Sequence, residues 1–193
     1  MRELDDTLRT IWQLIGRGAA DRRHGFHWPV VCTIGAGAAE GRVVVLRGAD
    51  PATRRVWFHT DIRSAKIEQL DGLSWMFYDP KARMQVRIHG TTTLAGDATA
   101  DREWDGLPAS SRRTYLVEPA PGTALGDQWS SGRPEADADR LPSPSETAPA
   151  RANFAVVVTV VHRLESLKLG RAGHERARFE WLGDELHATW LVP

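Results

Sequence analysis

The chain has 193 residues, of which 41% are apolar and 26% charged, a composition typical of a globular domain and not of a disordered or fibrous chain. Its 25 basic and 25 acidic side chains balance, which argues against nucleic acid or an anionic membrane as a partner. No apolar run approaches the roughly 18 residues that a membrane span needs, and the N-terminus lacks the apolar centre of a signal peptide. The single Cys32 cannot form an internal disulfide, so we expect a cytoplasmic protein.

The first segment is amphipathic. Leu4, Leu8 and Ile11 recur at helical spacing, and acidic residues stand in the opening turn. The sequence therefore predicts an N-terminal helix within residues 1–20.

Short β-branched runs separated by turn residues follow, the pattern of antiparallel strands joined by hairpins. A glycine- and alanine-rich turn over residues 35–41 is expected to join the first two runs. Residues 62–70 carry apolar residues at helical spacing and predict a short helix. The expected strands cover residues 29–34, 42–46, 55–59, 73–78 and 84–94.

The second half of the chain alternates between regular and irregular patterns. Residues 99–116 predict a helix, and the proline-rich residues 118–151 predict a long irregular loop. Residues 153–193 predict the C-terminal strands. Strands in hairpins, few helices and no βαβ alternation indicate a mainly β barrel with α additions, in a single domain over residues 1–193.

Arg42 and Arg47 stand at the two ends of one predicted strand. Because they differ by an odd number of positions, a regular strand points them to opposite faces. A bulge or a strand end would have to turn one of them if both served one ligand. The alternative is that both are strand-edge charges that discourage sheet association.

The run His59-Thr60-Asp61-Ile62-Arg63-Ser64-Ala65-Lys66 lies where a strand gives way to a helix. There backbone N–H groups, a hydroxyl and an ammonium group can converge on a phosphate. The alternative is that Ser64 only caps the helix and Lys66 is solvated.

Gln85 shares a strand face with Arg87 and His89, opposite the apolar face. An amide and a cation suit the polar edge of an isoalloxazine ring, so with the preceding residues this set is what a flavin mononucleotide (FMN) site needs. The alternative is that this face meets solvent. The spacing of His24 and His27 could suit a metal, but no Cys or further His lies near them in the sequence, so a loop is favoured and no metal is expected.

The order RVVVLR, FHTDIRSAK and FYDPKARMQVRIHG resembles the flavin-binding region of the pyridoxamine 5′-phosphate oxidase-like split barrels, in particular the bacterial pyridoxamine 5′-phosphate oxidase-related subgroup. The resemblance covers roughly residues 24–123 and, more loosely, the C-terminal hairpin. It implies a six-stranded antiparallel split β-barrel and a homodimer with FMN at the subunit interface. The flavin contacts that it implies are Arg42, Arg47, His59, Thr60, Ser64, Lys66, Gln85 and Arg176.

The resemblance also implies substrate contacts at Tyr115 and His174. The chain departs from the oxidases in the cations that would hold substrate phosphate and flavin. The residues at these positions are Ala65, Met84, Glu118 and Ala172.

These features predict an FMN-binding oxidoreductase that acts on an unidentified small molecule. One alternative is an authentic pyridoxamine or pyridoxine 5′-phosphate oxidase. From a different class, the alternative is a non-catalytic protein that binds flavin, deazaflavin or haem.

Overall fold

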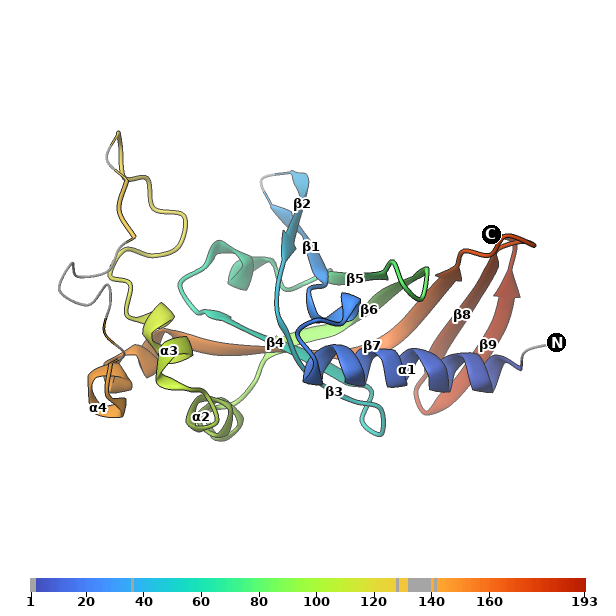
Figure 1. Ribbon diagram of the computed structural model, residues 1–193, viewed down its shortest axis with the longest axis horizontal. Helices are drawn as coiled ribbons and strands as arrows, with labels where there is room; N and C mark the ends of the chain where they lie inside the picture. Colours follow the sequence, from blue (N-terminus) through green and yellow to red (C-terminus); the bar gives the residue numbers. More distant parts are fainter. Residues whose placement is uncertain (1–2, 36, 128, 132–139, 141) are drawn as a thin grey trace. The chain divides into compact units, whose positions relative to one another are not determined.

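The computed structural model describes residues 3–35, 37–127, 129–131, 140 and 142–193. Within them, nine strands form one sheet in the order β2-β1-β5-β6-β7-β4-β3, with β8 paired to β7 and β9 to β8 (Figure 1). This confirms the mainly β class, with nine strands in place of the six expected. The strands are β1 (Val30–Gly35), β2 (Ala38–Val43), β3 (Leu46–Asp50), β4 (Arg55–Asp61), β5 (Ser74–Asp79), β6 (Met84–Leu94), β7 (Phe154–Lys168), β8 (Glu175–Leu182) and β9 (Glu185–Leu191).

The helices are short apart from the first. The α-helices are α1 (Leu4–Ala20), α2 (Asp97–Asp105), α3 (Ala109–Arg112) and α4 (Pro144–Thr147). The 3₁₀ turns are η1 (Gly25–His27), η2 (Ala65–Gln69), η3 (Arg113–Tyr115) and η5 (Ala148–Asn153). Within the described residues, no helix combines the length and the apolar character required to cross a membrane.

The chain divides into two compact units. The first unit comprises Met1–Phe58, Gln69–Thr93 and Val157–Pro193, and the second comprises His59–Glu68 and Leu94–Val156. The single domain expected over residues 1–193 stays a prediction.

In the first unit, α1 lies against β3, β9 and η1 (Figure 1). Its apolar stripe buries Ile11, Trp12 and Ile15. Gly18 is required for this packing, because a Cβ there would come within 2.8 Å of the backbone of Phe26.

The sheet of the first unit has two different faces, because successive side chains point to opposite sides. The inner face carries Trp75 and Phe77 of β5 opposite Ile88 and Val86 of β6, all of them buried. The rings of Trp75 and Phe77 stack at 5.8 Å, and the indole Nε1 of Trp75 donates to Oγ1 of Thr159 at 2.9 Å. The inner face is therefore a closed core.

The prediction of one strand over residues 42–46 is wrong. β2 begins at Ala38, inside the expected turn, and ends at Val43, and β3 begins at Leu46. The register of β3 against β4 shifts between Leu46 and Gly48, which marks a β-bulge. Gly48 is required beside this bulge, because a Cβ would come within 1.9 Å of the indole ring of Trp57.

In the second unit, the helix expected over residues 99–116 is broken. α2 ends at Asp105, and Pro108 precedes α3 because proline cannot continue a helix. Residues 144–151 are helical in place of the irregular loop expected there. Ser143 and Glu146 form a reciprocal capping box that starts α4, with Ser143 N donating to Glu146 Oε2 at 2.7 Å. Residues 128, 132–139 and 141 of the expected loop lie outside the described residues.

Candidate functional site

Two polar clusters contain four of the ten site residues that the sequence predicted. The first lies in the second unit, where β4 ends and the chain turns into η2. Nζ of Lys66 donates to Oγ1 of Thr60 at 2.9 Å and to Oγ of Ser64 at 2.6 Å. The turn is closed by Ser64 N, which donates to the carbonyl of Asp61 at 3.1 Å. An ammonium group and two hydroxyls thus lie together, as a phosphate site requires. We call Thr60, Ser64 and Lys66 the lysine cluster.

His59 lies just before the lysine cluster, and its imidazole is buried. Its Nε2 lies 3.0 Å from Oε2 of Glu103 on α2. Its ring packs edge-on against Phe154, with the ring centroids 4.8 Å apart. The side chain therefore ties β4 to α2, and its role as a flavin contact stays a prediction.

The second cluster lies on the outer face of the sheet in the first unit. Oε2 of Glu165 on β7 accepts from Nη2 of Arg87 at 2.6 Å and from Nη2 of Arg176 at 2.9 Å. Oε1 of the same carboxylate accepts from Nε of Arg178 at 3.2 Å. One carboxylate thus holds three guanidinium groups. We call Arg87, Glu165, Arg176 and Arg178 the arginine cluster.

A cavity of about 240 Å³ opens beside the arginine cluster. Gln85 lies at its wall on β6, opposite Tyr78 of β5 in the register. The cavity is lined by Gln85, Arg87, Glu165, Ser166, Leu167 and Arg176.

The pKa values of two groups on this face depart from their ordinary values. Burial of the Glu165 carboxyl acts to raise its pKa, but hydrogen bonds from Arg176 and Arg87 outweigh burial and lower the pKa from 4.5 to about 2. Burial lowers the pKa of His89, and the positive charges of Arg163 and Arg87 lower it further. Glu165 is therefore ionised at neutral pH, and the face carries an excess of positive charge.

Arg42 does not lie on this face. Its Nη1 donates to Oγ1 of Thr33 at 2.7 Å, and Thr33 donates in turn to Oε1 of Gln69 at 2.7 Å. An ion pair joins Arg42 to Glu40. In the register Arg42 is opposite Val31, which is buried with the inner core, so Arg42 and Gln85 belong to opposite faces of one sheet.

Arg47 is exposed and lies in the bulge between Leu46 and Gly48. The two arginines expected on one strand therefore lie on different strands. We expected a bulge if both arginines were to bind one ligand. A bulge is present, but it lies on β3, after Arg42 in the chain.

The predicted substrate contacts lie in different units. The ring of Tyr115 packs edge-on against Phe154 and Trp104 in the second unit, at centroid distances of 5.2 and 6.0 Å. His174 is exposed in the β7–β8 turn of the first unit, where its Nδ1 accepts from Gly170 N at 3.3 Å. Both roles stay predictions.

The structure adds Glu165 and Arg178 to the set that the sequence indicated. Glu165 lies in the mixed second half of β7, near Arg163 and Lys168, so its charge alone did not single it out. Arg178 follows Arg176 with period two, which places both on one strand face. Glu103 carried no comparable signal, because a charged residue on a short helix is ordinary.

The donors of each cluster, taken separately in its own unit, suit one part of FMN. The lysine cluster offers an ammonium group and hydroxyls, which suit a phosphate monoester. The arginine cluster and Gln85 offer guanidinium groups and an amide, which suit the nitrogen- and oxygen-rich edge of an isoalloxazine ring.

Comparison with known proteins shows which family the chain is similar to. The family profile described as the pyridoxamine 5′-phosphate oxidase FMN-binding domain matches residues 11–96, which include the lysine cluster and Gln85. Over this region the chain is similar to the pyridoxamine 5′-phosphate oxidase-like family. A curated relative, pyridoxine/pyridoxamine 5′-phosphate oxidase 2 of Arabidopsis thaliana, is 30% identical over 128 residues, which cover 59% of this chain and 63% of that protein. The chain thus matches less than two thirds of that relative's length.

Solved structures of the family share the fold. A pyridoxamine 5′-phosphate oxidase-related, FMN-binding protein of Nostoc punctiforme superposes with a TM-score of 0.72, at 24% identity and with 96% of each chain covered. PhzG of Burkholderia lata, solved with tetrahydrophenazine-1-carboxylic acid, superposes with a TM-score of 0.69 at 20% identity, covering 100% of this chain and 97% of its own. These likenesses confirm the split-barrel fold expected for the family.

Proposed function

We propose that this protein binds FMN and acts as an oxidoreductase on a small organic molecule. The observation that carries the proposal is the lysine cluster, which lies inside the matched FMN-binding region. A phosphate monoester carries roughly two negative charges at neutral pH, and an ammonium group beside two hydroxyls complements that charge. Thr60 is buried, so these donors are partly shielded from water and from competing salt.

FMN, when bound, supplies the electron-transfer chemistry, and the chain's residues bind and orient it. Lys66 and Ser64 are proposed to hold the phosphate, and Gln85 and Arg176 to contact the polar edge of the ring. The proposed flavin contacts are Arg42, Arg47, His59, Thr60, Ser64, Lys66, Gln85 and Arg176.

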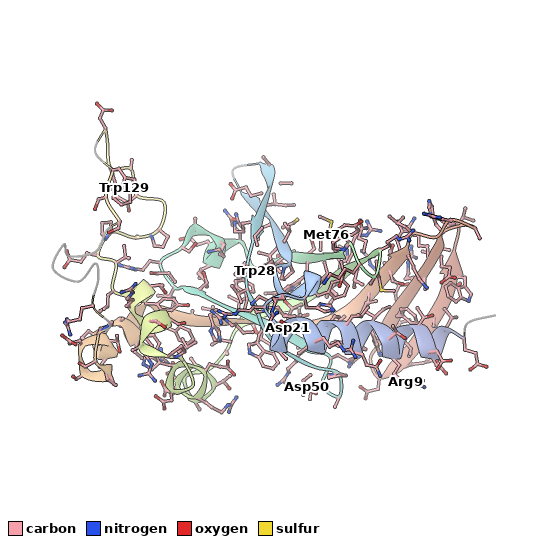
Figure 2. All side chains as sticks on the ribbon, viewed as in Figure 1. Arg9, Asp21, Trp28, Asp50, Met76 and Trp129 are labelled. Atoms are coloured by element: carbon pink, nitrogen blue, oxygen red, sulfur yellow. The ribbon has the colours of Figure 1, made fainter. Side chains whose placement is uncertain are left out.

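We propose further that the protein is a homodimer with FMN at the subunit interface. The outer face exposes apolar side chains on neighbouring strands, among them Val43 and Met76, which stand on either side of Val30 in the register. Met76 is labelled in Figure 2. Exposed apolar surface on adjacent strands is typical of an interface. Gln85 adjoins this surface, because it pairs with Tyr78. A dimer in which each chain supplies some of the contacts also reconciles the opposite faces of Arg42 and Gln85.

The substrate is proposed to be a small molecule other than pyridoxamine 5′-phosphate. Glu118 stands where the oxidases place a cation for substrate phosphate, and a carboxylate there repels a phosphate monoester. The relative that is 30% identical favours an authentic oxidase as the second candidate. Formation of pyridoxal phosphate at micromolar substrate would establish that candidate, and a cytoplasmic location stays a prediction.

Titration with FMN tests the proposal. Binding quenches flavin fluorescence and gives a dissociation constant. We expect Lys66→Gln to weaken FMN binding by at least about tenfold, a loss of about 1.4 kcal/mol. Lys81→Gln, which changes an exposed lysine in the β5–β6 turn, is the matched control and should bind as the parent does.

The outcome is read in two steps. A purified protein that takes up no FMN on titration contradicts the proposal as a whole. A protein that binds FMN tightly but whose flavin is neither reduced by nicotinamide nucleotides nor reoxidised by oxygen is a carrier or sensor, and the oxidoreductase part is then wrong.

A further inference from the structure

The arginine cluster contains a buried acid that the FMN contacts alone do not explain. Glu165 is 8% exposed and lies on β7. Burying a carboxylate is costly unless it is paired and hydrogen-bonded. Arg87, Arg176 and Arg178 meet that requirement from the two strands on either side, β6 and β8.

The cluster has more cations than its acid can neutralise. Three guanidinium groups surround one carboxylate, and Arg178 also approaches Glu180 at 3.9 Å. Arg87 and Arg176 each reach Oε2 of Glu165 through a single terminal nitrogen, whereas a guanidinium group has five N–H donors. Both guanidinium groups therefore keep donors for a further group, and both line the cavity beside Gln85.

We propose that Glu165 is a positioning residue that holds Arg87 and Arg176 together at the wall of this cavity, where they face the N1–C2 edge of the flavin. The inference rests on the proposed function, since Arg176 and Gln85 are flavin contacts only if FMN binds. It adds Arg87 to the proposed flavin contacts and assigns a role to the buried carboxylate of Glu165. Without the carboxylate, like charges a few ångströms apart repel one another and the guanidinium groups move apart.

The expected effect concerns reduced flavin more than oxidised flavin. Reduction by two electrons with uptake of one proton leaves a negative charge that is shared by N1 and the C2 carbonyl. Two guanidinium groups held at that edge stabilise the reduced form and raise the reduction potential. Removing Glu165 has two opposite consequences: one negative charge fewer raises the potential, and displacement of the guanidinium groups lowers it.

The experiment measures the FMN dissociation constant, the flavin midpoint potential and the thermal midpoint of Glu165→Gln. If positioning dominates, we expect FMN binding about tenfold weaker, and a tenfold loss of preference for the reduced form, which corresponds to about 30 mV for a two-electron couple. Glu165→Asp, which keeps the charge, should recover at least half of each loss. Glu180→Gln removes an acid from the same face of β8 and should change either quantity by less than twofold.

Two results would overturn the inference. One is a Glu165→Gln protein with the affinity and potential of the parent, and the other is a potential that rises, since that indicates a charge effect without positioning. If Glu165→Gln does not unfold cooperatively, Arg87→Gln is measured in its place. We expect the same losses of FMN affinity and midpoint potential, and parental values of both would overturn the inference. Failure of the parent protein to bind FMN overturns the proposed function itself, and the parent titration alone shows this.

Discussion

The two faces of the sheet in the first unit carry different kinds of side chain, although the same alternating strands supply both. On the inner face Trp75, Phe77, Val86 and Ile88 are almost fully buried and pair across β5 and β6. The residues that alternate with these on the same two strands face outward. They are Met76, Tyr78, Gln85 and Arg87, and Met76 and Tyr78 are exposed.

The difference separates stability from recognition. The inner face gains free energy by removing apolar surface from water, and any side chain of the right volume serves it. The outer face combines apolar side chains with the arginine cluster, and such a surface is useful only when something covers it. Substitutions on the inner face should therefore be tested by measuring stability, and substitutions on the outer face by measuring binding.

The largest expected effect lies on the inner face. Phe77→Ala should lower the free energy of unfolding by about 3–5 kcal/mol, because it removes a buried ring and leaves a cavity. Urea denaturation measures the loss. Its neighbour Met76 is the matched control: Met76→Ala should cost less than about 1 kcal/mol in the monomer, as is usual for exposed sites. Equal losses at both positions would erase the distinction between the faces.

A smaller effect is expected from acid on the arginine cluster. Because the folded pKa of Glu165 is lowered to about 2, its ionised form contributes stability above the unfolded value of 4.5, and this is lost as pH falls through about 2. The contribution is at most about 3 kcal/mol. The free energy of unfolding of Glu165→Gln, followed from pH 6 to pH 2, should fall less steeply than that of the parent. Parallel curves would show that pairing of Glu165 with arginine does not contribute to the free energy of unfolding.

The next effect concerns the exposed apolar part of the outer face. Met76→Glu should weaken the proposed dimer by at least about tenfold, or about 1.4 kcal/mol, because a charge would be buried in the interface. Sedimentation at micromolar concentration gives the dissociation constant. Leu182→Glu places the same charge at another exposed apolar residue and should leave the dimer unchanged. A parent protein that sediments as a monomer contradicts both the dimer and an interface flavin site.

The smallest expected effect is at His89, which shares a face with Arg87. Its folded pKa is lowered below the ordinary 6.5, first by burial and then by Arg163 and Arg87, so the folded protein binds fewer protons than the unfolded chain. Stability is therefore full above about pH 6.5 and declines as pH falls below that value, by less than about 1 kcal/mol down to pH 5.5. His89→Asn should remove this decline. An unchanged slope in the variant would assign the decline to other groups.

Local patterns were enough for several parts of the molecule. The alternation in Met84–Leu94 predicts which side chains enter the core, and Val86 and Ile88 do so. Thr60, Ser64 and Lys66 are close in the chain, so a single turn brings them together and sequence spacing predicts their contact. The resemblance that names the family rests on the same short-range motifs.

Long-range pairing decided the rest. Arg87 and Glu165 are 78 positions apart and meet only because β6 and β7 are neighbours in the sheet, and Arg176 joins them through the register of β7 with β8. Arg42 and Arg47 lie on two strands because β2 ends at Val43 and pairs with β1, whereas β3 begins at Leu46 and pairs with β4. Side-chain alternation is a property of neighbouring residues, so the sequence alone determines it. Strand order and register are set by packing between distant segments, so only the tertiary structure shows which charges come together.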